Sequence, residues 1–264
     1  AMKGTRNFTI NSLNPKRKDP IEYVFDFRSA FLPIVIPVLL ICGLILPANF
    51  STVFVLFFTS LMLMFVGRIK TKYILSFIGI GILCFGLFIL YIFLFPNTSN
   101  RVATWKARIE NFMDKKSEKN YQVEQAKIAI ATGGIMGKGP GKSTQRNFLP
   151  HPYSDFIYAI IIEEYGMAGG IIVIFLYMIL LYRAVRIATK SQKIFGSLLS
   201  IGCCFSLVFQ AMLNLSVAVN IVPVTGQPLP LVSMGGTSIW FTSIAIGMVL
   251  SVSREIDKQN VVNG

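Results

Sequence analysis

Long stretches without charge constrain this chain more than any other feature. Residues 31–67 and residues 73–95 contain no Asp, Glu, Lys, Arg or His. A helix needs about 20 mostly apolar residues to cross a bilayer. Of the 264 residues, 53% are hydrophobic, more than a water-soluble domain needs. The pattern therefore predicts an all-α integral membrane protein.

The uncharged stretches predict six transmembrane helices. Pro47-Ala48-Asn49 interrupts the first stretch, and both proline and asparagine favour a turn, so we expect a helical hairpin there. The expected spans are 31–46, 50–67, 73–95, 155–182, 194–222 and 236–253, with a short loop or re-entrant turn at 226–233. The chain then divides into an N-terminal segment 1–30, three helices in 31–95, a large loop 96–153, three helices in 154–253 and a tail 254–264.

Charge in the short loops predicts the orientation. Loops 68–72 and 183–193 contain Lys and Arg but no acid. Short loops follow the positive-inside rule, so both are expected in the cytoplasm, together with both termini. The loop 96–153 is then extracytoplasmic. It carries ten Lys or Arg and four Asp or Glu, but long loops are translocated largely regardless of their charge.

The net charge of +13 does not indicate nucleic acid here. Base recognition needs a folded soluble module, whereas anionic lipid headgroups and lipid phosphates attract the same charge. The four cysteines lie inside apolar runs and are expected to be packing residues, without a disulfide framework or a Cys-based metal site.

The segment 121–142 combines a predicted helix with a glycine-rich loop. Val123, Ala126 and Ile130 have helical spacing, which predicts an amphipathic helix at the membrane interface. Five glycines follow, with Lys138 and Lys142 among them. Such a loop suits an anionic ligand such as pyrophosphate; a flexible solvated loop is the alternative. A nucleotide-binding P-loop is excluded, because the motif's first glycine is missing and no strand precedes it.

Asp155 stands where the large loop enters the fourth expected span. It could cap the helix, as could Ser154, or it could act as a general base for a hydroxyl of a lipid-linked substrate. Glu163 and Glu164 follow, about 12–14 Å deeper along a continuous helix, where acids are usually functional or paired. At about 100° per residue, the three acids cannot all face one cavity. Asn214, in the fifth span, would form interhelical hydrogen bonds or line a substrate groove.

Three stretches carry a resemblance to a known family. The first is Pro47-Ala48-Asn49-Phe50-Ser51-Thr52. The second joins residues 108–112 and 121–122 to residues 133–170 (GGIMGKGPGKSTQRNFLPHPYSDFIYAIIIEEYGMAGG). The third is Asn214 with residues 222–238 (VPVTGQPLPLVSMGGTS). Together they resemble the SEDS family, which includes FtsW, RodA and SpoVE. The large loop is most similar to the FtsW branch, and the resemblance runs over residues 20–256. It implies a ten-helix fold, of which this chain matches the last six.

The resemblance also implies a peptidoglycan glycosyltransferase that polymerises lipid II during septal cell wall synthesis. The C4 hydroxyl of the acceptor attacks C1 of the donor, and undecaprenyl pyrophosphate leaves. The family's essential loop aspartate falls on Asp155, which is the expected general base. The expected substrate-binding residues are Arg108, Gln122, Lys138, Lys142, Ser143, Gln145, Arg146, Glu164, Asn214, Thr225, Ser233, Gly235, Gly236 and Ser238. A divalent metal, Mg or Mn, could help bind pyrophosphate, but no ligand cluster in the sequence identifies one.

Expected partners, besides lipid II, are a class B penicillin-binding protein transpeptidase and other division proteins, at the septum of the bacterial cytoplasmic membrane. The sequence departs from the family pattern at Asn49, His151, Thr225 and Met234. Two alternatives stay open: a lipid II flippase, which needs a polar path through the helices, and a non-catalytic scaffold of the division machinery.

Overall fold

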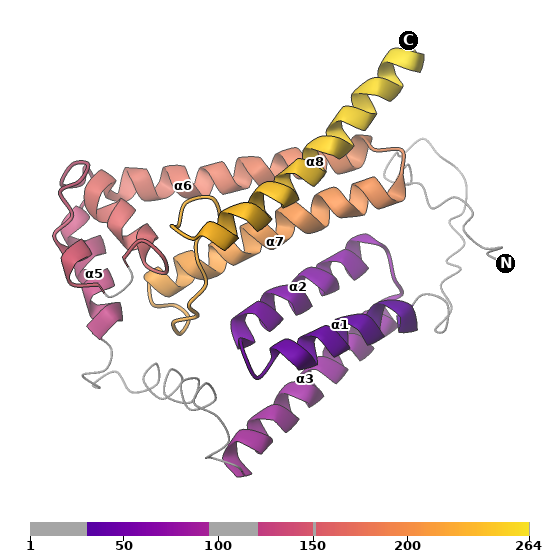
Figure 1. Cartoon of the computed structure of the whole chain (residues 1–264), viewed down its shortest axis with the longest axis horizontal. Coiled ribbons are helices and arrows are strands. Elements are labelled where there is room, and N and C mark those ends of the chain that lie inside the picture. The colour runs from indigo at the N-terminus through magenta and orange to yellow at the C-terminus, as the bar shows by residue number, and fades with distance from the viewer. Residues whose placement is uncertain (1–30, 95–120, 150–151, 264) are drawn as a thin grey trace.

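A computed structural model describes residues 31–94, 121–149 and 152–263, which form helices and no strand (Figure 1). The helices are α1 (Leu32–Ile45), α2 (Phe50–Val66), α3 (Thr71–Leu94), α5 (Tyr121–Gly133), the short 3-10 helix η4 (Gln145–Asn147), α6 (Ile157–Lys190), α7 (Ile194–Ala218) and α8 (Gly236–Asn263). The all-α prediction is confirmed for this part of the chain. The predictions on Arg108 and His151 lie outside the described residues.

Four helices, α3, α6, α7 and α8, are long and apolar enough to cross a membrane. The predicted hairpin is present: α1 and α2 have 14 and 17 residues, and the Asn49 side chain caps α2 by accepting a hydrogen bond from Thr52 N at 3.4 Å. At about 1.5 Å per residue, α1 is about 21 Å long, shorter than a hydrocarbon core of about 30 Å. Six complete spans therefore remain a prediction.

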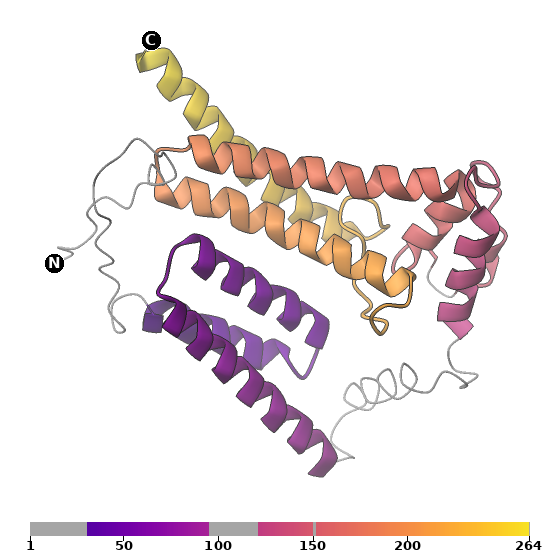
Figure 2. The ribbon, with the colours of Figure 1, turned by 180° about the vertical axis from the view of Figure 1, so that it is seen from behind.

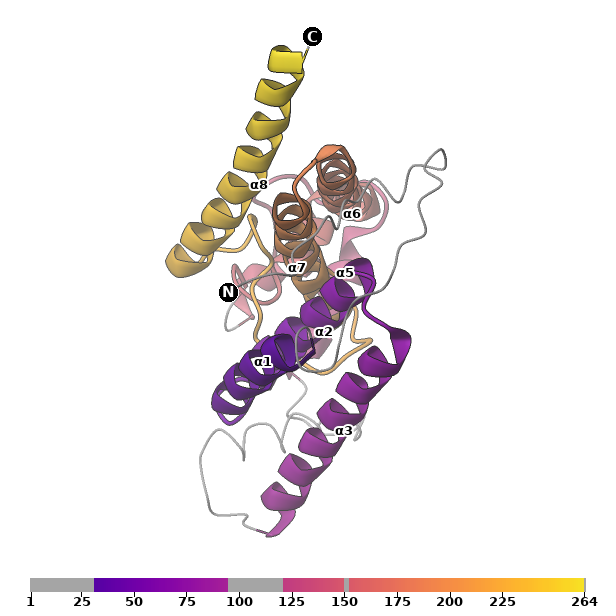
Figure 3. The same ribbon diagram turned by 90° about the vertical axis from the view of Figure 1, so that its right-hand side faces the viewer.

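The helices pack around α7, which contacts α2, α6 and α8. α6 and α7 run side by side and α8 crosses them, while α1 and α3 flank α2 (Figures 1 and 2). Viewed along the bundle, α8 and α3 lie at opposite edges (Figure 3). Phenylalanines join α2 to α7: the ring centroids of Phe58 and Phe209 are 4.5 Å apart, and those of Phe54 and Phe209 are 5.9 Å apart.

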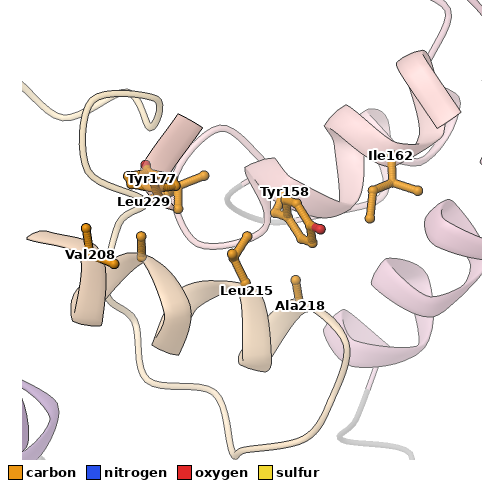
Figure 4. Close-up of a cluster of buried hydrophobic side chains, with 8 residues drawn as sticks. Tyr158, Ile162, Tyr177, Val208, Leu215, Ala218 and Leu229 are labelled. Carbon is orange, nitrogen blue, oxygen red and sulfur yellow. The ribbon is translucent and has the colours of Figure 1, made fainter. Parts of the chain in front are cut away.

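The segment between α7 and α8, residues 219–235, turns back into the bundle. We call it the signature loop. Leu229 is fully buried in a core cluster with Tyr177 of α6 and Val208 of α7 (Figure 4). The Tyr177 hydroxyl donates a hydrogen bond to Pro230 O. The segment therefore folds back against α6 and α7, and a re-entrant position in the membrane stays a prediction.

The two basic short loops lie at one end of the bundle, and α5 with its glycine-rich loop lies at the other (Figure 1). Lys193, at the start of α7, forms an ion pair with Glu255 of α8. This arrangement agrees with a topology in which the short loops share one side of the membrane. Which side faces the cytoplasm remains a prediction.

α6 is broken at Gly166, whose φ of 71° and ψ of −174° are not helical. Residues 167–190 after the break are about 36 Å long at about 1.5 Å per residue, enough to cross a core of about 30 Å. The prediction of one continuous span over 155–182 is therefore wrong. Glu163 and Glu164 belong to a separate first segment, 157–165, rather than to a position deep inside a spanning helix.

The glycine-rich loop supplies the backbone groups that the break would leave unpaired. Lys138 N and Gly139 N donate to the carbonyl oxygens of Glu163 and Glu164, each at 2.9 Å. In the other direction, Met167 N donates to Gly134 O at 2.9 Å. Because unpaired backbone groups are costly when buried, these bonds make the break and the loop mutually dependent.

Only glycine fits where the two backbones meet. A Cβ atom on Gly166 would lie 2.1 Å from Ile135 O, and one on Gly137 would lie 2.3 Å from Glu164 O. Both residues also have positive φ, 71° and 77°. The helix break therefore requires glycine on both sides of the contact.

We expect Gly166→Ala to destabilise the protein more than Gly86→Ala. The backbone conformation of Gly166 is essentially restricted to glycine and costs an L-residue about 1–3 kcal/mol, and the clash with Ile135 O adds to that cost. An added Cβ at Gly86 of α3 would meet nothing within 4 Å. Thermal unfolding in detergent would measure both variants. An equal melting temperature for the two would contradict the packing described for the break.

Candidate active site

Asp155 lies in the turn that leads into α6, half-buried, and Phe156 rather than Asp155 is the N-cap residue. No side chain caps the start of α6 by a hydrogen bond. The capping interpretation of Asp155 and of Ser154 is therefore wrong. Instead, Ser154 Oγ donates a hydrogen bond to Asp155 Oδ1 at 2.9 Å. Among the described residues, only Ser154 forms a hydrogen bond with the Asp155 carboxylate.

The backbone before α6 is fixed by other parts of the fold. Three consecutive carbonyl oxygens each accept a hydrogen bond from α7 or the signature loop. The bonds are Met234 N to Tyr153 O (2.9 Å), Ser233 Oγ to Ser154 O (2.6 Å) and Asn214 Nδ2 to Asp155 O (3.0 Å). The main chain at Asp155 is thus held rigidly, while its carboxylate is bonded only to the neighbouring serine within the described chain.

The same two side chains also shape the signature loop. Asn214 donates a second hydrogen bond to Gln227 O at 2.7 Å, and Ser233 Oγ accepts one from Leu229 N at 2.7 Å. Asn214 Oδ1 is buried and has no hydrogen-bond partner among the described residues. Asn214 and Ser233 therefore join the backbone at Asp155 to the signature loop, and their predicted role in substrate binding stays a prediction.

Further hydrogen bonds tie the signature loop to the start of α2. Gln227 Nε2 donates to Thr52 Oγ1 at 3.0 Å, and Ser51 Oγ donates to Thr225 O at 3.2 Å. These bonds span more than 170 positions of sequence, 174 and 175. Ser51 and Thr52 were not predicted as site residues, although they belong to the segment 47–52 that carried part of the resemblance.

A polar cavity of about 670 Å³ lies beside these contacts, between α2, α7, α8 and the signature loop. Its lining combines uncharged polar side chains with a few apolar ones. The polar residues are Asn49, Thr52, Ser206, Gln210, Gln227, Thr237, Ser238 and Thr242. The predicted residue Ser238 therefore faces this cavity, and the predicted glycines Gly235 and Gly236 form the entry into α8.

Glu163 forms a second polar centre, at the end of the first segment of α6. The side chain is fully buried, and the glycine-rich loop surrounds it with donors. The donors are Lys138 Nζ (2.5 Å), Ser143 Oγ (2.5 Å), Thr144 Oγ1 (2.8 Å), Thr144 N (3.1 Å) and Gln145 N (3.3 Å). A buried carboxylate is stable only when it is paired and hydrogen-bonded, so Glu163 holds the loop 133–149 in one conformation.

This centre reassigns three residues predicted to bind substrate. Ser143 is buried against Glu163, Lys138 is paired with it while 28% of its side chain remains exposed, and Gln145 contributes its backbone N–H. The prediction of a flexible solvated loop is wrong for this segment. Thr144, absent from the prediction, donates twice to the carboxylate; a lone threonine in a loop gave no signal for this role.

The remaining predicted residues are open to solvent to differing degrees. Lys142 is exposed, and Arg146 and Glu164 are half-exposed. None of the three forms a side-chain hydrogen bond or ion pair with another described residue. Gln122 lies half-buried in α5. The structure thus brings Asp155, Asn214 and Ser233 together, whereas the loop cations Lys142 and Arg146 are left available to a ligand.

No metal centre is evident among the described residues. No three His, Cys, Asp or Glu side chains lie together there. Asp155 is a single carboxylate, and both oxygens of Glu163 already accept hydrogen bonds from the loop. The donor set therefore gives no basis for assigning Mg or Mn, and we derive no step through a metal.

Comparison with known proteins identifies the family. A family model for cell cycle proteins of the FtsW, RodA and SpoVE type matches residues 11–258. The chain belongs to this family. The family resemblance that residues 133–170 and 222–238 carry is therefore confirmed.

Relatives from several branches are similar to this chain. Stage V sporulation protein E of Bacillus subtilis is 31% identical over 251 residues, which cover 94% of this chain and 65% of that protein. The probable peptidoglycan glycosyltransferase FtsW of Haemophilus influenzae is 34% identical over 231 residues, covering 86% and 57%. The peptidoglycan glycosyltransferase MrdB of Escherichia coli is 36% identical over 152 residues, covering 56% and 41%.

Solved structures show the same fold. A chain from a study of "structural coordination of polymerization and crosslinking by a peptidoglycan synthase complex" has a TM-score of 0.62 and 25% identity, over 90% of this chain and 64% of that one. The rod shape determining protein RodA of Thermus thermophilus has a TM-score of 0.56 and 24% identity, over 89% and 59%, a likeness of fold alone. The chain spans less than two thirds of the length of these relatives.

We expect Glu163→Ala to loosen the glycine-rich loop. A buried hydrogen-bonding group left without its partner costs about 1–3 kcal/mol, and the substitution removes the acceptor of Ser143, of Thr144 and of the partly exposed Lys138. Hydrogen exchange followed by mass spectrometry should show faster exchange across residues 134–149. Glu164→Ala is the matched control, since Glu164 forms no side-chain hydrogen bond with the described residues. Equal protection in the two variants would contradict the role given to Glu163.

Proposed function

We propose that this protein is a peptidoglycan glycosyltransferase that polymerises lipid II, with Asp155 as its general base. The observation that carries the proposal is the contrast at Asp155. Three bonds from α7 and the signature loop hold the adjacent backbone, while the half-buried carboxylate is bonded, among the described residues, only to Ser154. A general base must be positioned firmly yet remain free to accept a proton. The printed names of the FtsW and MrdB relatives support the same reaction.

In the proposed reaction, Asp155 accepts the proton of the C4 hydroxyl of the acceptor sugar. The oxygen then forms a bond to C1 of the donor sugar, and the bond between C1 and the pyrophosphate oxygen breaks. Undecaprenyl pyrophosphate leaves with the electron pair, and the proton on Asp155 passes to solvent. General-base assistance of this kind contributes about 10²–10⁴-fold in rate.

Lys142 and Arg146 are our candidates for binding the pyrophosphate. Both are cations of the loop that follows α5, and neither is paired with a described acid. Cations near a departing pyrophosphate stabilise the charge that develops on it. Lys138 is given a different role, because its ammonium group is engaged by Glu163 and Thr144.

We further propose a septal role in the bacterial cytoplasmic membrane, alongside a class B penicillin-binding protein transpeptidase. The FtsW relative and the description of a complex that couples polymerisation to crosslinking support this assignment. The sporulation relative and MrdB support the other roles found in the family.

A lipid II flippase is the second candidate, and the polar cavity of about 670 Å³ favours it. The cavity lies between membrane-spanning helices and is lined by uncharged hydrogen-bonding groups, such as Ser206 and Thr242. It provides part of the polar path that transport requires. The position of Asp155 favours the polymerase, because a transporter needs no acid fixed beside the end of a loop.

We expect Asp155→Asn to lower the rate of glycan strand formation by about 10²–10⁴-fold. The amide has nearly the same shape but cannot accept the proton. The measurement is polymerisation of purified lipid II by the protein in vesicles that also contain a class B penicillin-binding protein.

The matched control is Asp257→Asn, which should retain the parent rate. Asp257 is exposed and lies near the C-terminal end of α8. Unchanged polymerisation by Asp155→Asn would refute the role of general base. If lipid II crossing were lost while strand synthesis continued, transport would be the function. If both activities were absent from the parent protein and partner binding remained, a scaffold would be indicated.

A further inference from the structure

The tip of the glycine-rich loop exposes two large apolar side chains. Ile135 is 76% exposed and Met136 is 89% exposed. Burying such a side chain is worth about 1.5–3 kcal/mol, so leaving both in water forgoes that stabilisation. They stand between Gly134 and Gly137, whose φ values of 56° and 77° turn the backbone into and out of the tip.

The tip is held in place rather than left loose. Gly134 O accepts a hydrogen bond from Met167 N at 2.9 Å, and Gly137 N donates to Gly133 O at 2.8 Å. The carbonyl group of Ile135 lies so close to Gly166 that a Cβ there would be 2.1 Å from its oxygen. The pair Ile135-Met136 is therefore fixed against the break in α6.

That break lies about one bilayer thickness from the basic end of α6. The segment 167–190 is about 36 Å long, against a hydrocarbon core of about 30 Å, and it ends at Lys190. Directly beyond the break, α6 exposes Met167 (48%) and Ile171 (60%). Exposed apolar residues on a helix of this length suit contact with acyl chains, and the tip lies beside them, against Gly166.

The charge of the loop complements a phospholipid surface. Residues 134–149 contain no acid. Lys142 and Arg146 are not paired with a described acid, whereas the third cation, Lys138, is engaged by Glu163. Tyr165, exposed beside the break, is of the type enriched where a helix leaves the hydrocarbon region. A lipid leaflet offers acyl chains to the tip and phosphates to the cations at the same depth.

The sequence had suggested α5 as the interfacial element, and the structure assigns its apolar face elsewhere. Val123 and Ala126 are buried, and α5 packs on α6.

We propose that the tip formed by Ile135 and Met136 inserts into the acyl-chain boundary of the leaflet at this end of the bundle. It thereby sets the depth of the glycine-rich loop in the membrane. This inference does not depend on the proposed enzymatic activity.

The test uses the whole chain in vesicles of phosphatidylethanolamine and phosphatidylglycerol, with Trp105 and Trp240 replaced by Phe. A single tryptophan is then placed at the tip (Met136→Trp) or, as the matched control, at exposed Asn147 (Asn147→Trp). We expect lipids brominated near the headgroup end of their acyl chains to lower the fluorescence of the tip variant about twofold, since the tip would lie in the headgroup–acyl boundary region. The control should change little.

Two outcomes would overturn the inference. Quenching of the tip variant by aqueous acrylamide but not by brominated lipid would place the tip in water. Quenching by neither reagent would mean that protein covers it. If the tryptophan-free background does not fold, Met136→Cys and Asn147→Cys in the native background give a second measurement. The tip cysteine should react more slowly with a membrane-impermeant maleimide in vesicles, and equal rates would contradict lipid insertion.

Discussion

A buried negative charge organises the end of the molecule that carries the candidate site. The Glu163 carboxylate has no access to water and accepts all five of its hydrogen bonds from residues 138–145. An unpaired carboxylate in that position would cost several kcal/mol. The loop therefore has to close over Glu163 whenever α6 folds, and the break at Gly166 supplies the space and the free backbone groups with which it does so.

The first segment of α6, residues 157–165, connects the two polar centres. Asp155 precedes it and is held by α7 and the signature loop, while Glu163 lies near its end and is held by the glycine-rich loop. Between them, Phe156, Ala159 and Ile160 pack in one core cluster with α5 and α7. The proposed base and the proposed pyrophosphate-binding loop are thus parts of one rigid unit, so that their relative position is set before substrate binds.

The break also resolves a conflict between charge and membrane. A continuous helix would carry Glu163 and Glu164 into the hydrocarbon region, where acids are expensive. With the helix interrupted, residues 167–190 are long enough on their own to cross the bilayer, which would leave both acids outside the hydrocarbon region. The polar cavity beneath the signature loop lies on the other side of α7 and is lined by a different set of helices.

Much of the architecture follows from local sequence signals. The apolar stretches predicted helices where α1, α2, α3, α6, α7 and α8 lie, but α6 is interrupted at Gly166, and α6 and α8 run on to Lys190 and Asn263, beyond the expected ends at 182 and 253. Asn49 marked the hairpin, and the pattern in 121–132 predicted α5. Asp155, Asn214 and Ser233 were also selected from the sequence. The pattern was misleading where a residue's partner is distant: the apolar face of α5 packs on protein rather than lipid, and Lys138 and Ser143 pair with Glu163 rather than standing free for a ligand.

The sequence by itself determined that the chain is helical, membrane-embedded and a member of its family, because hydrophobicity over 20 residues and short glycine- and proline-containing motifs are properties of contiguous residues. Only the tertiary structure decided where α6 breaks and which polar groups are consumed within the fold. Those outcomes depend on contacts such as Gly137 with Gly166, and Gln227 with Thr52, between residues far apart along the chain. The sequence does not distinguish a carboxylate that is buried and hydrogen-bonded from one that is partly exposed. Packing alone distinguishes Glu163 from Asp155 in this way.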